Sequence, residues 1–199
     1  MKHCLVALLA SVLALSVVPA DAQQKSQRIR GTITAFDGTM LSVKSRDGRD
    51  LMIELGEKAS VAAAKAITLA DLKQGDYVGT TTTTRADGAL VAVEVHTIPR
   101  TVREGHVPWD LLPGSMMTNA SIESIVQSTG GQELTLVYKE GSQKILVPPG
   151  TPIVTTVSAD RSFLKPGEYV WLNAEVGADG KLTFSGRIQV SRDGVRPPH

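Results

Sequence analysis

The sequence has a single cysteine, Cys4, which lies near the N-terminus ahead of an apolar run. If this N-terminal segment is removed on export, the mature chain has no thiol. Disulfides, thiolate metal ligands and cysteine nucleophiles are then excluded together. We therefore expect packing and backbone hydrogen bonds alone to stabilise the fold.

Aromatic residues make up only 4% of the chain, and neither sign of charge is in excess. Without residues 1–22 the chain loses one of its 21 Lys and Arg residues and one of its 20 Asp and Glu residues, leaving 20 basic and 19 acidic residues. Binding to nucleic acid depends on a positive field, and stacking on single strands depends on aromatic side chains. We therefore expect no nucleic-acid partner.

Residues 1–22 have the layout of a cleavable signal peptide. A basic start is followed by the apolar run Leu5 to Val18 and by small residues before the cleavage point. The run has 14 residues, fewer than the roughly 20 that a membrane-spanning helix needs. We expect cleavage near Ala22/Gln23, a periplasmic location and no transmembrane segment after cleavage.

The chain repeats itself at a distance of about 92 residues. The segment Leu72 to Val78 aligns with Leu164 to Val170, and Ala86 to Leu90 aligns with Ala178 to Leu182, both at an offset of 92. Earlier in each copy the offset becomes 93, as one residue inserted in a turn would explain. Two aligned blocks at one offset indicate a duplication.

Each copy is expected to form about five strands, because β-branched or alternating runs are separated by Asp-Gly turns that accept positive φ. The expected strands are 28–36, 40–44, 50–55, 76–85 and 89–98, then 120–127, 133–139, 143–147, 168–176 and 182–190. Between the third and fourth strands of the first copy, the Ala-rich stretch 60–72 is expected to hold a short helical turn capped by Thr68; the second copy is Pro-rich there. This order predicts an all-β protein of two tandem five-stranded OB-like small barrels. Two half-open meanders packed into one sandwich are the alternative.

The predicted organisation places barrel repeat 1 at 23–98, a linker at 99–119 and barrel repeat 2 at 120–199. The linker has three prolines and two glycines, which disfavour regular structure, yet it is too apolar for a solvated tether. We expect an ordered strap that packs on the barrels and anchors Trp109 in the groove between them.

Three segments of the sequence are similar to those of a known family: Glu104 to Leu111 in the linker, the following Pro113 to Ala120, and the C-terminal Arg192 to Pro198. They resemble a family of uncharacterised proteobacterial exported proteins with tandem small β-barrel domains of unknown function. The resemblance implies fold and compartment, and it brings no catalytic or ligand residues. Members often carry the label metal ABC transporter permease, which the sequence contradicts, because a permease needs several spanning helices.

The inter-barrel groove is the expected recognition surface. His106, Trp109 and Asp110 are the predicted ligand-binding residues, because they are the polar and aromatic linker groups that are least required for the fold of the barrels. The chain has neither a Gly-x-Ser-x-Gly nucleophile motif nor a Gly-rich phosphate loop. We therefore expect a non-catalytic binding or interaction module without a cofactor, whose partner is a protein or small molecule of the cell envelope.

The alternative function is a metal-handling accessory protein. No local metal-ligand spacing is present, but a distributed zinc or copper site could use His96, Glu104, His106 and Asp110.

Two further interpretations concern the strands. Thr80 to Thr84 is expected to form a solvated strand face, with a sugar- or ice-binding face as the alternative. Tyr77, Tyr169 and Trp171 are expected in the barrel cores, with ligand stacking as the alternative.

Overall fold

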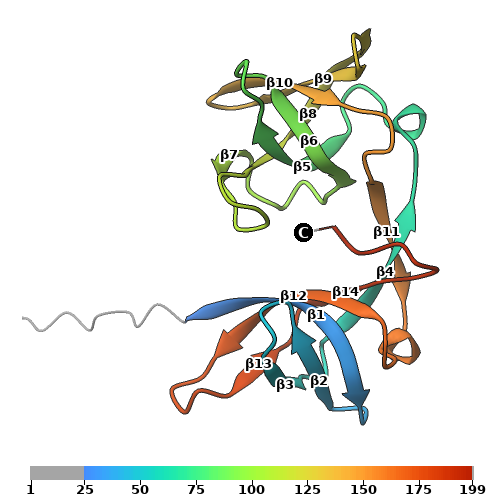
Figure 1. Ribbon diagram of the computed structural model, residues 1–199. Helices are drawn as coiled ribbons and strands as arrows, with labels where there is room; N and C mark the ends of the chain where they lie inside the picture. The colour runs from blue at the N-terminus through green and yellow to red at the C-terminus, as the bar shows by residue number, and fades with distance from the viewer. Residues whose placement is uncertain (1–24, 199) are drawn as a thin grey trace, which may run out of the picture.

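The computed structural model describes residues 25–198, and this part of the protein is all-β apart from two single turns of 3-10 helix (Figure 1). The predicted signal peptide, residues 1–22, lies outside the described residues. In the first half of the chain the elements are β1 (Ser26–Phe36), β2 (Met40–Ser45), β3 (Asp50–Leu55), β4 (Ser60–Ala66), η1 (Leu69–Asp71), β5 (Tyr77–Thr84), β6 (Leu90–Thr97) and β7 (Gly105–Pro108). The second half contains β8 (Met116–Ser128), β9 (Gly131–Tyr138), β10 (Gly141–Val147), β11 (Ile153–Ala159), η2 (Arg161–Phe163), β12 (Tyr169–Val176), β13 (Leu182–Phe184) and β14 (Arg187–Val190).

All ten expected strands are present within a few residues, with the last one divided into β13 and β14. The predicted Asp-Gly turns close hairpins as expected. At Asp37-Gly38, for example, the carboxylate accepts hydrogen bonds from the backbone N–H groups of Thr39 (2.9 Å) and Met40 (2.7 Å), and Gly38 has a φ of 104°. Within residues 25–198, no helix is long and apolar enough to cross a membrane.

Five strands form a closed barrel, here called ring A. The pairs β1–β2, β2–β3, β13–β12 and β12–β1 are antiparallel, and β3–β13 is parallel. Buried aliphatic side chains from all five strands fill it, among them Ile29, Leu41, Ile53, Leu172 and Leu182.

The pairings of five further strands close a second cycle, here called ring B. The pairs β8–β9, β9–β10, β6–β5 and β5–β8 are antiparallel, and β10–β6 is parallel. A separate hydrophobic cluster fills it, including Val78, Val95, Ile122, Leu134 and Ile145. Figure 1 shows the two rings as distinct bodies, with the segment that follows β14, up to Pro198, running between them.

Each ring combines strands from both halves of the sequence, so the predicted division into barrels at 23–98 and 120–199 does not match the strand pairing. The chain leaves ring A after β3, runs along β4 and enters ring B as β5; it later leaves ring B after β10 and returns along β11. The strands β4 and β11 pair antiparallel, from Ala66↔Val154 to Val61↔Ala159, and connect the rings (Figure 1). Equivalent repeats present equivalent strand edges, so repeat similarity alone does not decide which halves pair.

Most of the Ala-rich stretch is a strand, β4, which the sequence analysis did not predict; the short helical turn expected within 60–72 is limited to η1. In β4, Ala62, Ala63 and Ala64 are all buried, because β14 pairs with one edge of the strand and β11 with the other. Pairing on both edges outweighs the helix preference of alanine. The capping role of Thr68 is confirmed: its N–H and hydroxyl both donate to Asp71 Oδ2 at 2.8 Å, at the start of η1.

The linker also contains regular structure, contrary to the expectation from its prolines and glycines. β7 pairs antiparallel with the start of β8, from Gly105↔Asn119 to Pro108↔Met116. The predicted boundary between residues 119 and 120 therefore falls inside β8. Pro108 ends β7, where the hairpin leaves the strand pairing.

The exchange of strands can be tested by cutting the chain between its halves. We would insert a protease recognition sequence between Arg103 and Glu104, which are both exposed. After cleavage the two fragments should stay together in gel filtration, because each ring holds strands of both, and they should separate only in denaturant. Separation under native conditions would contradict the exchange, and the uncut insertion variant is the control.

Candidate functional site

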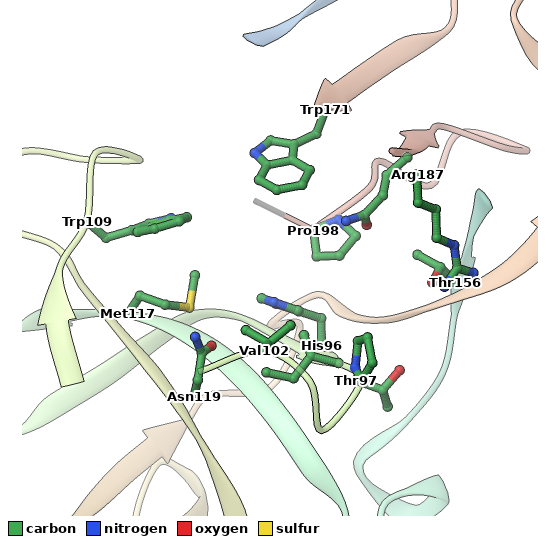
Figure 2. Close-up of a pocket in the computed structure, with 13 residues that line it drawn as sticks. His96, Thr97, Val102, Trp109, Met117, Asn119, Thr156, Trp171, Arg187 and Pro198 are labelled. Atoms are coloured by element: carbon green, nitrogen blue, oxygen red, sulfur yellow. The ribbon is translucent and has the colours of Figure 1, made fainter. Parts of the chain in front are cut away.

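A cavity of about 290 Å³ lies between ring A and ring B, here called the inter-ring cleft (Figure 2). It is lined by residues of β6 and β8 of ring B, of β12 and the adjoining β14 on the side of ring A, of β11, of the segments after β6 and β7, and of the C-terminal tail. Its principal lining residues are His96, Trp109, Met117, Trp171, Gln189 and Pro198. The cleft is therefore a feature of the assembled molecule and belongs to neither ring alone.

On the ring B side, three residues lie in one row across neighbouring strands: His96, Gly79 and Asn119. A Cβ atom at Gly79 would lie 2.5 Å from Nε2 of His96 and 3.0 Å from Oδ1 of Asn119. Glycine is thus required for both side chains to lie over the backbone of β5. Between His96 and Asn119, β5 therefore projects no side chain, because residue 79 is glycine.

On the ring A side, the corresponding row is Gln189, Trp171 and Arg30. Trp171 is the repeat counterpart of Gly79, at the same offset of 92. The duplicated position therefore carries the smallest side chain on one wall and the largest on the other. This difference lets the Trp171 indole project into the space between the rings, as Figure 2 shows.

Two residues that line the cleft from the side of ring A each have a buried polar atom without a hydrogen-bond partner among the described residues. These atoms are Nε1 of Trp171, a donor, and Oε1 of Gln189, an acceptor. Their residues are paired directly across β12 and β14, and both line the cleft. Buried polar groups in proteins are nearly always hydrogen-bonded, so this pair favours a ligand that accepts one hydrogen bond and donates another.

The threonine run of β5 is largely buried, which corrects the expectation of a solvated face. Thr80, Thr81 and Thr82 are all fully buried. Thr80 donates to the backbone oxygen of Glu94 (2.7 Å), and Thr81 donates to its carboxylate (3.1 Å). The same carboxylate lies 3.9 Å from Nδ1 of His96. These threonines hold Glu94 beside the cleft histidine.

Trp109, a predicted ligand-binding residue, lines the cleft, and two arginines of ring A contact its ring. The Arg28 guanidinium lies 4.2 Å from the centre of the Trp109 ring, and that of Arg30 lies 5.8 Å away. Both distances are within the range of a cation–π interaction. The indole is thus fixed by β1 on one side and open to the cleft on the other.

Asp110, a predicted ligand-binding residue, is bound by arginines of ring A instead. Its carboxylate accepts hydrogen bonds from Nη1 (3.2 Å) and Nη2 (3.0 Å) of Arg30, which is buried, and lies 3.4 Å from Arg28. Arg46 donates to the backbone oxygens of Asp110 and Leu111, both at 3.0 Å. Asp110 therefore fastens the segment after β7 to ring A and positions Trp109 beside it.

The ion pair also sets the ionisation of this carboxyl. Partial burial alone would raise the pKa of Asp110, but the hydrogen bond and charge of Arg30 and the charge of Arg28 outweigh it and lower the pKa. Asp110 is therefore ionised whenever the pH is above its ordinary titration range.

His106 lies away from the cleft. Its Nδ1 is 2.8 Å from the hydroxyl of Thr118, and burial lowers the pKa of His106, which favours the neutral ring. Thr118 and Asn119 are neighbours on β8 and so point to opposite faces of the strand. His106 thus lies on the face opposite to the row of Asn119 and His96.

The structure does not bring together the four residues of the alternative metal site. His96 faces the cleft, His106 pairs with Thr118 on the opposite face, Asp110 is held by arginines, and Glu104 is exposed. Within residues 25–198, no group of three or more His, Cys, Asp or Glu side chains is placed to hold a metal ion.

Trp171 is the main site residue that the sequence analysis misplaced. It was expected in a barrel core, but Val170 and Leu172 fill the core and Trp171 points outward between them. The alternation of the strand and the Gly79 counterpart in the repeat alignment were the signals that could have identified it. Tyr77 and Tyr169 are also outside the two hydrophobic clusters, and each has an arginine over its ring.

Comparison with family models, with curated proteins and with solved structures gives no match for this chain. The inference about function therefore depends on the geometry of the inter-ring cleft.

Replacing Asp110 with alanine should release the segment that carries Trp109. Because Arg30 would remain buried without its carboxylate, we expect a loss of about 1–3 kcal/mol of unfolding free energy, below the cost of breaking a fully buried pair because Asp110 is partly solvated. Urea denaturation measures this, and the Trp109 emission should shift to the red. The matched control is Asp50→Ala, which removes only an exposed pair with Lys44 and should cost about 0–1 kcal/mol.

The same variant has a pH signature. The pKa of Asp110 is lowered in the folded state, so its contribution to stability is present above the unfolded pKa of about 4 and is lost as the pH falls through the folded pKa. The stability difference between wild type and Asp110→Ala should therefore shrink in acid. If the stability difference between the two proteins stayed constant down to low pH, the ionised carboxylate of Asp110 would not be what fastens this segment to ring A.

Proposed function

We propose that this protein is a non-catalytic binding module that takes its ligand in the inter-ring cleft. The observation that carries the proposal is that both tryptophans of the chain line this one cavity, together with a donor and an acceptor that have no partner within residues 25–198. Aromatic walls with a few convergent polar atoms are typical of ligand sites. The ligand is a molecule or segment of the cell envelope.

The size of the cavity limits what it can enclose. At about 290 Å³, it is slightly smaller than the range for small-molecule sites, about 300–1,000 Å³. We infer that it receives a small ligand or a short segment of a larger one.

We propose further that both rings are OB-like small barrels and that residues 99–119 act as a strap between them. The parallel pairs β3–β13 and β10–β6, each next to an antiparallel closing pair, support this reading. It agrees with the resemblance to exported proteins with tandem small barrels. The signal-like N-terminus supports a periplasmic location for the mature protein.

The polar groups around the cleft suit holding a ligand more than transforming one. The indole and amide of the ring A wall are neutral hydrogen-bonding groups. The imidazole of His96 lies against Gly79, and Glu94 beside it is held by Thr81. We therefore assign these groups to recognition.

Intrinsic fluorescence tests the proposal directly, because both tryptophans line the cleft. We would titrate the full mature chain with pools of short peptides, oligosaccharides and small aromatic compounds. At least one pool should shift the emission, and Trp171→Ala should weaken its binding, measured by calorimetry, by about tenfold or more, as for an interface hot spot. Val126→Ala, at an exposed position of β8, is the matched control and should bind normally. If no pool changes the emission of either the full chain or a chain that ends at Arg196, the cleft is not a ligand site.

A further inference from the structure

The C-terminal tail enters the inter-ring cleft after a fixed turn. Beyond β14, Ser191 is buried and exchanges two hydrogen bonds with the backbone of Tyr169, each 2.7 Å long. The chain then turns at Asp193 and Gly194, which have φ values of 52° and 79°, and a backbone pair joins Arg192 to Val195. The tail therefore leaves ring A in a defined direction.

After the turn, the tail packs on aromatic side chains. The Arg196 guanidinium lies 4.8 Å from the centre of the Tyr169 ring. Pro197 and Pro198 are both buried. Figure 2 shows Pro198 between Trp171 and His96, and all three line the cleft. Pro198 thus lies against the aromatic wall of the cleft, and Pro197 is buried next to it in the chain.

Proline suits this position for physical reasons. It has no backbone N–H, so its burial leaves no donor without a partner. Consecutive prolines favour the polyproline II conformation, whose carbonyl groups make no internal hydrogen bonds and remain free to accept. The cleft offers the matching group, the buried N–H of Trp171, which has no partner among residues 25–198. Grooves lined by aromatic residues recognise proline-rich segments in this way.

The cleft continues on the other side of the tail. A second cavity of about 660 Å³ is lined by Gly194 to Pro197, and by Glu94 and Leu111. Glu94 lies two residues from His96 on β6, and Leu111 lies two residues from Trp109, so the two cavities flank the tail along the same elements. The space between the rings is therefore longer than the part that Pro197 and Pro198 fill.

We propose that the inter-ring cleft recognises an extended, proline-containing segment of a partner protein, and that the chain's own Pro197-Pro198 occupies the site as a built-in competitor. This inference rests on the proposed function and adds to it the chemical class of the ligand. Displacement of the tail opens the cleft along its length, and the partner's prolines pack against Trp171 and Trp109.

The test uses the mature chain with and without its last residues. The truncated variant ends at Arg196, so it keeps the turn and the contact with Tyr169. The probe is a synthetic peptide with the sequence of residues 192–199, and the control peptide has alanine in place of both prolines. Binding is measured by tryptophan emission and calorimetry, with Trp171→Ala in the truncated chain as the site control.

We expect the truncated chain to bind the proline peptide and the full chain to bind it about tenfold or more weakly, because a tethered tail competes at an effective concentration on the order of millimolar. The alanine peptide should bind at least about tenfold more weakly than the proline peptide, and Trp171→Ala should lose binding, as at a hot spot. If the truncated chain is folded and binds neither peptide, the inference is wrong. The proposed function would still stand if a pool without proline bound through Trp171.

Truncation could also unfold the protein, and a second variant covers this case. In the full chain with Pro197→Ala and Pro198→Ala, the inference predicts red-shifted tryptophan emission and a gain of peptide binding. A lowered melting temperature without any gain of binding would show that the prolines only stabilise the fold, and would overturn it. Self-association of the full chain that depends on these prolines would assign the segment to a second copy, and would also overturn the partner named here.

Discussion

The antiparallel pairing of β4 with β11 constrains the path of every other strand. These two strands are equivalent in the repeat, and each leaves the ring in which it began and reaches the other ring. β4 also pairs with β14, and β11 with β6, so the connection is continuous with both rings. The last strands of each repeat therefore pair with the first three strands of the other repeat. The result is the arrangement of a strand-exchanged dimer within one chain.

This arrangement explains why a cleft exists between the rings. Equivalent rows of β5 and β12 face the same space, and a duplication with identical sequences would give them identical walls. Divergence at one pair of positions, Gly79 and Trp171, lowers one wall and extends an indole from the other. The two walls therefore differ at one pair of positions, without any change to the hydrophobic clusters that stabilise the rings.

Two segments outside the rings complete the cleft, and each is held by arginine. The segment after β7 is fastened through Asp110 to Arg28 and Arg30, which also cover the back of Trp109. The C-terminal tail is positioned by the turn after Ser191 and by Arg196 on Tyr169. Ion pairs and cation–π contacts of this kind are weaker than packed cores. The edges of the cleft are therefore easier to open than the rings themselves.

Local features of the sequence determined the all-β class, the ten repeat strands and the Asp-Gly turns, because strand alternation and positive φ act over a few residues. The tertiary structure decided the rest. It made the alanines of β4 a strand by pairing both edges, bound Asp110 to Arg30 from 80 residues away, and turned Trp171 into the inter-ring cleft. It also decided that the halves exchange, since two equivalent edges compete for the same strand and only the assembled sheet selects between them.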